Sequence, residues 1–212
     1  WQNQSLTYLV ASDNRGFKTI EDTFADGLPN AVVNHDRYAA HFKMNAKHHQ
    51  ICIAHLLREL NYLDELYNIK SSWSKDFKQL LYDAIELKKQ QSVADYYRPS
   101  QNRDILFDRL NHLLHYAVDA DCKKVLTLQK KLLSHSNYIL YFLLQPNVPP
   151  DNNGSERAIR NVTVKRKISG QYKSMDGAVI FAVLRSVIDT AMKSGQNALN
   201  ALYTIAVFSG AE

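Results

Sequence analysis

The sequence predicts an α/β domain that is interrupted by a large helical insertion. In residues 1–55, short apolar runs with β-branched residues alternate with helical spacings. In residues 56–147, apolar side chains recur at spacings of three and four, a pattern typical of amphipathic helices. Prolines 146, 149 and 150 mark the end of the insertion, and the last segment, residues 148–212, carries capping residues and a long helical pattern. The outer segments are therefore predicted to form one domain around the insertion.

The composition excludes several classes of protein. The chain has 212 residues, of which 45% are hydrophobic, so it can bury a core and is not a disordered chain. Cys52 and Cys122 are too few for a disulfide framework, and nothing resembles a signal peptide, so we expect a reducing cytosol. No apolar run approaches the roughly 18 residues that a membrane span needs. Because the chain begins with Trp1 and not with Met, we expect it to be a fragment.

The first 55 residues are predicted to alternate strands and helices. Thr19 can cap a helix that carries Ile20 and Phe24, and the run 31–33 predicts a short buried strand. This strand runs into Asp36, and polar residues at the carboxyl end of a buried strand are where open α/β sheets place their sites. The other predictions are a strand over 6–11, a turn over 13–16, a helix end at Gly27, a strand over 51–54 and a helix over 55–69.

The rest of the chain is predicted to be mostly helical. Residues 162–164 are the exception, because their β-branched run favours an extended segment, which would point Lys165 and Lys167 to one side. The apolar stripes comprise Leu56, Leu60, Leu63 and Tyr67; Phe77, Leu80, Leu81, Ala84 and Ile85, after a predicted cap at Ser74; Leu106, Leu110, Leu113, Leu114 and Ala117; and Val125, Leu128, Leu132 and Leu133. Further helices are predicted from near Ser155, over 177–193 with an end at Gly195, and after a cap at Asn197.

Two acidic residues are candidates for chemistry. Asp36 follows the predicted buried strand, and Glu156 lies near a predicted helix start, with Arg160 four positions on. Carboxylates at such positions suit Mg²⁺, which prefers oxygen ligands. Each residue also has a simpler interpretation. Asp36 can cap a turn, and Glu156 can be an ordinary helix-start acid that pairs with Arg160.

Cys52 and His55 form a third local feature. The Cys-x-x-His spacing occurs in zinc modules, but no second pair with suitable spacing is present in the sequence. A Cys-His nucleophile would need an orienting third group, and the sequence points to none. A buried cysteine with a hydrogen-bonded histidine is the simpler interpretation.

The positive charge is concentrated in one short segment. The net charge is +5, which permits an anionic partner without proving one. Residues 151–174 contain only two acidic groups, and their basic residues are Arg157, Arg160, Lys165, Arg166, Lys167 and Lys173. These side chains suit phosphate contacts, or they form a solvated charged face.

Three motifs together carry a resemblance to a known family. Residues 151–160 match the pattern Asp-Asn-Asn-x-x-Glu-Arg-x-x-Arg, which resembles the signature around the last catalytic glutamate of insertion sequence 66 family transposases. Residues 33–40, Val-Asn-His-Asp-Arg-Tyr-Ala-Ala, resemble the segment around that family's second catalytic aspartate. Residues 52–60 are similar to its Cys-x-Ala-His motif at a helix start. The order and spacing of the three motifs also match.

The resemblance implies a ribonuclease H-like, retroviral integrase-like catalytic domain of the DDE class. Such a domain holds two divalent metals, Mg²⁺ or Mn²⁺, for phosphodiester cleavage and strand transfer. Asp36 would be the second carboxylate and Glu156 the third, both catalytic and both metal ligands. The first would lie before residue 1, so we expect this chain alone to be inactive. Asp13, which lies in a predicted turn, is the only early alternative.

The resemblance also implies partners. DNA, as transposon ends and as target, would contact Arg157, Arg160, Lys165, Arg166 and Lys167. A homo-oligomer on DNA, accessory transposition proteins and a bacterial cytoplasmic, nucleoid-associated location are expected, with no membrane partner. Two alternatives stay open. One is a non-catalytic helical DNA-binding or assembly module, and the other is a metal nuclease that acts on RNA or branched DNA.

Overall fold

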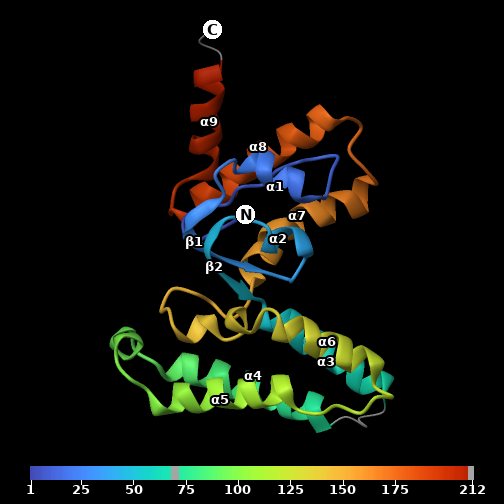
Figure 1. The fold of residues 1–212 in the computed structure, drawn as a ribbon. Helices are drawn as coiled ribbons and strands as arrows, with labels where there is room; N and C mark the ends of the chain where they lie inside the picture. The colour runs from blue at the N-terminus through green and yellow to red at the C-terminus, as the bar shows by residue number, and fades with distance from the viewer. Residues whose placement is uncertain (68–71, 210–212) are drawn as a thin grey trace. The chain divides into compact units, whose positions relative to one another are not determined.

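The structure is a computed structural model that describes residues 1–67 and 72–209 (Figure 1). It is mixed α/β and mostly helical, which confirms the predicted class in its coarse form. The chain divides into two compact units. One comprises Trp1–Ala25 with Asn153–Glu212, and the other comprises Asp26–Asn152. The predicted domain limits after residues 55 and 147 stay predictions.

The unit 26–152 contains a two-stranded parallel sheet. Strand β1 (Leu28–His35) pairs with β2 (Ala46–Ile51), and the short helix α2 (Ala39–Phe42) lies on the connection between them. The strand predicted over 31–33 is confirmed within β1. Gly27 precedes β1 with a φ of +72°, and a β-carbon there would collide with the backbone carbonyl of Asn45. This turn therefore requires glycine.

The second strand differs from its prediction. The sequence predicts a strand over 51–54, but β2 ends at Ile51 and helix α3 (Ile53–Leu66) begins two residues later. All three residues from Ile51 to Ile53 are fully buried. A short apolar run fits a buried strand end and a buried helix start equally well, so its periodicity could not separate them.

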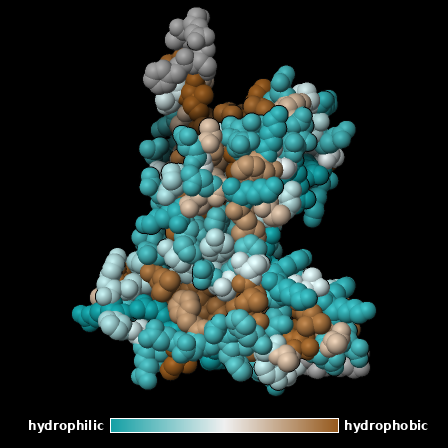
Figure 2. All heavy atoms as spheres, viewed as in Figure 1, coloured by the Kyte–Doolittle hydropathy of each residue, from teal (hydrophilic) through white to brown (hydrophobic). Residues whose placement is uncertain are grey.

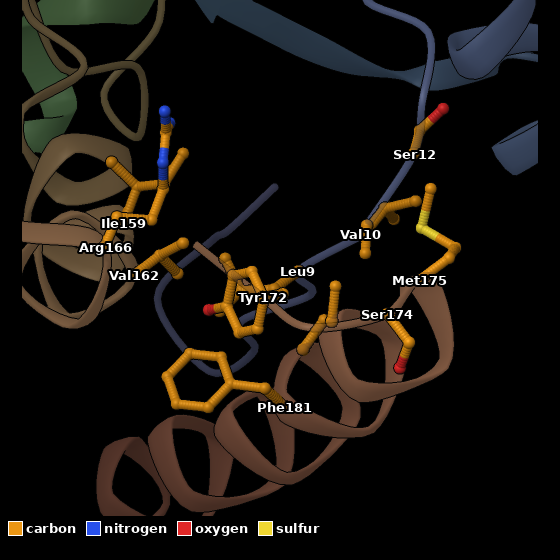
Figure 3. A pocket seen from close by; sticks show the side chains of 13 residues that line it. Leu9, Val10, Ser12, Ile159, Val162, Arg166, Tyr172, Ser174, Met175 and Phe181 are labelled. Atoms are coloured by element: carbon orange, nitrogen blue, oxygen red, sulfur yellow. The ribbon is translucent and has the colours of Figure 1, made fainter. Parts of the chain in front are cut away.

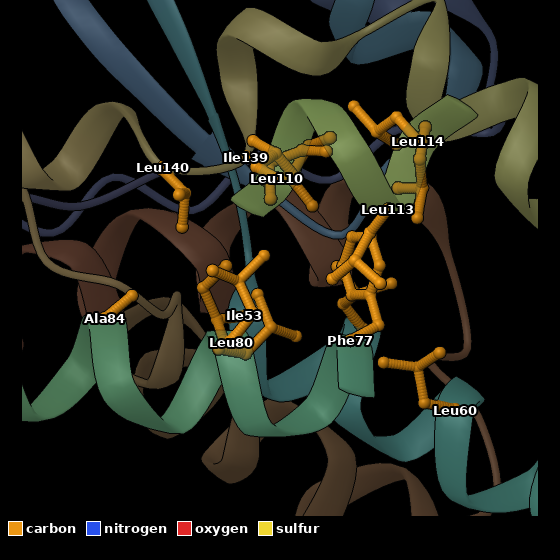
Figure 4. Packing of buried hydrophobic residues seen from close by; sticks show 14 of the residues in the cluster. Ile53, Leu60, Phe77, Leu80, Ala84, Leu110, Leu113, Leu114, Ile139 and Leu140 are labelled. Atoms are coloured by element: carbon orange, nitrogen blue, oxygen red, sulfur yellow. The ribbon is translucent and has the colours of Figure 1, made fainter. Parts of the chain in front are cut away.

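Most members of the predicted apolar stripes form the core of the helical part of this unit (Figure 4), but Ala117 and Leu133 are exposed and lie outside it. Phe77, Leu80 and Ala84 on one helix face Leu110 and Leu113 on another, and all five are buried. The helices are α4 (Ser72–Gln90), α5 (Gln101–His115) and α6 (Lys123–Leu133), with the 3-10 turns η1 (Val93–Tyr97), η2 (Ser136–Tyr138) and η3 (Tyr141–Leu143).

Two helices of this unit begin at residues other than those predicted. Ser74 is not a cap, because α4 begins at Ser72 and Ser74 is buried inside the helix, where its hydroxyl donates to the carboxylate of Asp64. A long-range polar contact therefore uses a residue type that otherwise favours caps. The helix predicted over 55–69 corresponds to α3, and residues 68–69 of that prediction lie outside the described residues.

The other unit is built on helices. Its elements are α1 (Phe17–Thr23), α7 (Asn153–Ser169), α8 (Met175–Lys193) and α9 (Ala198–Ser209). The predicted end at Gly195 is confirmed by its φ of +68°, and the predicted cap is confirmed because the side chain of Asn197 accepts the amide N–H of Leu199. Apolar side chains on α9, among them Leu199 and Tyr203, are exposed, and Figure 2 shows apolar surface beside the grey C-terminal residues.

The predicted strand over 6–11 is not a strand in the described residues. One isolated bridge joins Gln2 and Thr7, and the Tyr8 N–H donates to the carbonyl of Trp1, but the amides of Thr7 and Leu9 bond to hydroxyls of α8 instead of to a neighbouring strand. Thr7 N–H donates to Thr190 Oγ1 (3.1 Å), and Leu9 N–H donates to Ser186 Oγ (2.8 Å). Side-chain acceptors on a helix thus satisfy backbone groups that the apolar pattern assigns to a sheet.

The predicted extended segment 162–164 is also wrong, because α7 runs through it without a break. Thr163 bonds back to the carbonyl of Ile159 at 3.2 Å, as a helical threonine can. Strong helix formers flank the β-branched run on both sides, and the summed propensity of the segment favours a helix. Lys165 and Lys167 are therefore about 200° apart around the axis and do not point to one side.

Within residues 1–67 and 72–209, no helix is both long enough and apolar enough to cross a membrane.

Candidate active site

The carboxyl end of β1 presents a run of polar side chains. Asn34 and His35 close the strand, and Asp36 follows as an exposed residue. The backbone N–H of Cys52 donates to the carbonyl of His35 at 2.8 Å, which continues the parallel ladder one step beyond β2. Asp36 therefore occupies the sheet edge at which parallel α/β folds place their sites.

The carboxylate of Asp36 is held in its ionised form. Its Oδ1 lies 3.6 Å from Nδ1 of His41 and accepts the backbone N–H of Tyr38 at 3.1 Å. The contact with His41, followed by the Tyr38 N–H and the charge of His55, holds the pKa of Asp36 well below its usual range, although partial burial opposes the shift. An ionised, solvent-reachable carboxylate can bind a cation at neutral pH.

A buried histidine pair lies directly behind Asp36. His35 Nε2 lies 3.2 Å from His49 Nδ1, and the amide N–H of Arg37 donates to His35 Nδ1 at 3.2 Å. Because Nδ1 accepts, the neutral His35 carries its proton on Nε2 and donates it to His49. Burial first, and then the nearby His41 and His49, lower the pKa of His35 to about 3. The ring is therefore neutral at physiological pH.

This pair predicts a loss of stability in mild acid. His35 titrates at about 3 in the folded chain and at about 6.5 when unfolded. Between these values the unfolded state binds a proton that the folded state excludes, so the unfolding free energy should fall by about 1.4 kcal/mol per pH unit as the pH decreases. His49, whose pKa burial also lowers, acts in the same direction. The stabilisation that Asp36 contributes to the folded state is lost only as the pH falls below its ordinary pKa of about 4.

The measurement is urea unfolding between pH 7 and pH 4 with a chelator present. His35→Gln should flatten the pH dependence, whereas the same change at His112, which is exposed on α5, should leave it intact. An equal slope in the His35 variant would contradict the assignment.

The segment before α7 returns to the same end of β1. The Asn34 side-chain amide donates to the carbonyls of Pro149 (2.8 Å) and Asp151 (3.0 Å). The N–H of Asn152 donates to Cys52 Sγ at 3.3 Å. The start of the Asp-Asn-Asn pattern therefore lies against the strand end and the Cys-x-x-His motif, so all three sequence motifs contribute to this edge of the unit.

Cys52 fits the buried-cysteine interpretation better than a reactive one. Its side chain is fully buried at the start of α3, and burial raises the pKa of its thiol. A protonated thiol is a weak nucleophile and a poor metal ligand. Within the described ranges, no group of three or more His, Cys, Asp and Glu side chains is arranged to hold a metal ion. The buried, protonated thiol of Cys52 argues against a zinc site at Cys52 and His55.

Glu156 lies in the first turn of α7, where the helix dipole favours a negative charge. It belongs to the unit that contains α7, whereas Asp36 belongs to the unit that contains the sheet. The convergence of the two carboxylates stays a prediction.

Because α7 is a continuous helix, the basic residues predicted to contact DNA lie on different faces of it. Arg160 and Lys167 follow Glu156 by four and eleven positions and share its face of α7. Arg157 lies next to this face. Lys165 instead lies over two aromatic rings, with its Nζ 5.6 Å from the ring centroid of Tyr172 and 5.5 Å from that of Phe181.

Arg166 turns to a pocket of about 460 Å³ within the same unit. Figure 3 shows Arg166 with its helix neighbours Ile159 and Val162 on one side of this pocket and Tyr172 on another. Lys165 thus contacts aromatic rings of its own unit, and Arg166, although exposed, lines a pocket of that unit. Arg160 and Lys167 are exposed on a different face of the helix.

This division predicts unequal roles in binding DNA. Changing both Arg160 and Lys167 to Ala should weaken binding and reduce the slope of log affinity against log salt by about 1.8, as expected for two lost phosphate contacts. The matched variant Lys165→Ala with Arg166→Ala removes the same charge and should leave the slope nearly unchanged. A salt titration by fluorescence anisotropy checks both variants, and equal losses would contradict the division.

Sequence reasoning missed several neighbours of the strand end. His41, which lowers the pKa of Asp36, follows it by five positions, a spacing that no regular element predicts. His49, which pairs with His35, comes from the next strand. The ion pair between Arg37 and Glu59 joins the strand end to α3 and also had no signal in the sequence. Each is a contact that only the connection between the strands creates.

Comparison with known proteins now identifies the class. A family model described as Transposase IS66 family matches residues 2–180, which is most of the chain. The match places the chain among the transposases, the proteins that move DNA segments. The chain belongs to the IS66 family of transposases. No curated protein and no solved structure gives a significant match. Membership of this family implies, in general terms, a protein that interacts with DNA.

Proposed function

We propose that the chain carries the catalytic domain of a DDE-class transposase with a ribonuclease H-like fold. Asp36 and Glu156 would be carboxylates of its divalent metal site. The observation that carries the proposal is the position of Asp36, an ionised carboxylate at the carboxyl end of a parallel strand. The Asp151 end of the family signature lies against the same strand end, through the Asn34 amide.

The donor chemistry of these side chains fits a hard divalent cation. Mg²⁺ and Mn²⁺ prefer carboxylate oxygens, and Asp36 is both exposed and ionised. His35, directly behind it, is neutral and adds no repulsive positive charge. When bound, the metals would activate a hydroxyl and stabilise the leaving oxygen of a phosphodiester.

The chain's own residues would hold and orient the DNA. Asp36 and Glu156 would hold the metals, while Arg160 and Lys167 would contact phosphates along the face of α7 that carries Glu156. Phosphate contacts of this kind fix the register of a protein on DNA without reading its sequence. The proposal therefore assigns positioning to α7 and metal binding to the two carboxylates.

The experiment replaces Mg²⁺ by Fe²⁺ in the complete transposase bound to DNA. With ascorbate and peroxide, iron generates hydroxyl radicals that cut the polypeptide close to the metal. The expected cuts lie next to Asp36 and next to Glu156, and excess Mg²⁺ should suppress both. Asp36→Asn should remove both sets of cuts, because the two carboxylates would share one site. The same change at Asp108, which is exposed on α5, should not.

The outcomes separate the proposal from its alternatives. Cuts near only one of the two carboxylates would contradict a shared site. DNA binding without any metal-dependent cut would instead favour a non-catalytic DNA-binding or assembly module. Cleavage of RNA or branched DNA in preference to transposon ends would favour a different metal nuclease.

A further inference from the structure

We propose that the ion pair between Arg37 and Glu59 holds the turn that presents Asp36, which makes both of them positioning residues for the reaction. The inference rests on the proposed function, because it assigns a role in orienting the carboxylate named there. Three features of the described residues carry it: the backbone conformation of Arg37, the enclosure of its side chain, and the hydrogen bonds of the turn.

The first feature is the backbone of Arg37. Its φ is +69°, and within residues 1–67 and 72–209 no other non-glycine residue has a positive φ. A side chain with a β-carbon is disfavoured in this left-handed region, and arginine lacks the short polar group that lets Asn or Asp adopt it. Such a conformation persists only where surrounding contacts enforce it, and it is found mostly at functional sites.

The second feature is the contact that enforces it. The Arg37 guanidinium pairs with the carboxylate of Glu59, with only 16% of the Arg37 side chain exposed and 39% of the Glu59 side chain. Glu59 lies on α3, whose start is tied to the sheet by the Cys52 N–H bond to His35. The pair therefore connects the residue after Asp36 to a helix that the sheet holds in place. Removing one partner of such a partly enclosed pair leaves a largely buried charge without its counter-ion, which is costly.

The third feature is what the turn does to Asp36. With Arg37 left-handed, its amide donates to His35 Nδ1 and the next amide, of Tyr38, donates to Asp36 Oδ1. The Tyr38 bond depends directly on the backbone dihedral angles of Arg37. Without the ion pair, the turn can relax to an ordinary conformation, this bond is lost, and the Asp36 carboxylate is no longer held in its direction by the turn.

The first test follows amide hydrogen exchange in the metal-free chain. In Glu59→Gln, the amides of Arg37 and Tyr38 should exchange about tenfold faster, because the turn opens more often. Asp83→Asn breaks the ion pair with Arg109 between α4 and α5 and is the matched control, which should leave these two amides unchanged. Unchanged exchange in Glu59→Gln would overturn the proposal.

The second test uses a rescue that a purely structural ion pair would not show. In the complete transposase, Glu59→Gln should lower the rate of DNA strand cleavage about tenfold, whereas its effect on DNA affinity should be small. Adding Arg37→Gly should restore much of the rate, because glycine adopts a positive φ without steric cost. Adding Arg37→Ala should not. Equal rates for the two double variants would overturn the proposal.

The two proposals fail in different ways. Strand cleavage that survives Asp36→Asn would overturn the proposed function while the exchange result for Glu59→Gln stands. Unchanged exchange in Glu59→Gln, together with lost cleavage in Asp36→Asn, would overturn only the role of the ion pair.

Discussion

Replacing Asp36 by Asn is expected to lower DNA strand cleavage by the complete transposase at least about 1000-fold, equivalent to about 4 kcal/mol of transition-state stabilisation. The amide keeps the size of the side chain and can still accept the N–H of Tyr38, but it removes the negative charge. A metal ligand that is neutral binds a divalent cation far less well than a carboxylate does. The measurement is the single-turnover rate of cleavage on a transposon-end substrate.

The variant needs controls for folding and for charge. Asp36→Asn should retain the circular dichroism spectrum and the DNA affinity of the wild type, and Asp108→Asn should retain full cleavage. Glu156→Gln should reproduce the loss. Cleavage within about tenfold of the wild type in either carboxamide variant would remove that residue from the metal site.

The second large effect concerns Gln50, a fully buried polar residue in β2. Its amide nitrogen donates to the carbonyls of Ile51 (2.7 Å) and Ile139 (2.8 Å), and its oxygen accepts the N–H of Phe142 (2.7 Å). Gln50→Leu has a similar volume but leaves these groups buried without partners. At about 1–3 kcal/mol for each unsatisfied group, we expect a loss of roughly 3–5 kcal/mol in unfolding free energy.

Urea unfolding monitored by tryptophan fluorescence measures this loss, because Trp73 lies in the core of the same unit. Gln101→Leu makes the same substitution at an exposed position at the start of α5 and should change stability by less than about 0.5 kcal/mol. Similar stabilities for the two variants would show that the bonds of Gln50 contribute little.

The helical core could be predicted because its signal is local. Leu56, Leu60 and Leu63 recur at the helical period, and each is buried in the structure. The cap at Asn197 and the helix end at Gly195 also depend only on neighbouring residues. Patterns of this kind specify which face of a helix is buried before its packing partner is known.

Local patterns were misleading where a distant partner decides the structure. The run 6–11 has the composition of a strand, but hydroxyls of Ser186 and Thr190 on α8 accept its amides. The run 162–164 has β-branched residues, but its flanks extend a helix through it. Propensity is a weak preference that context overrides in both cases.

The candidate site also has features that the local sequence determined and features that distant contacts decided. The sequence by itself determined the family, through three motifs in order, and it placed Asp36 directly after a strand. Only the tertiary structure decided what surrounds Asp36: a neutral His35 bonded to His49, His41 beside the carboxylate, and the Arg37–Glu59 ion pair. The physical reason is that these contacts join residues from separate elements, whose meeting depends on the parallel crossover and not on any local spacing.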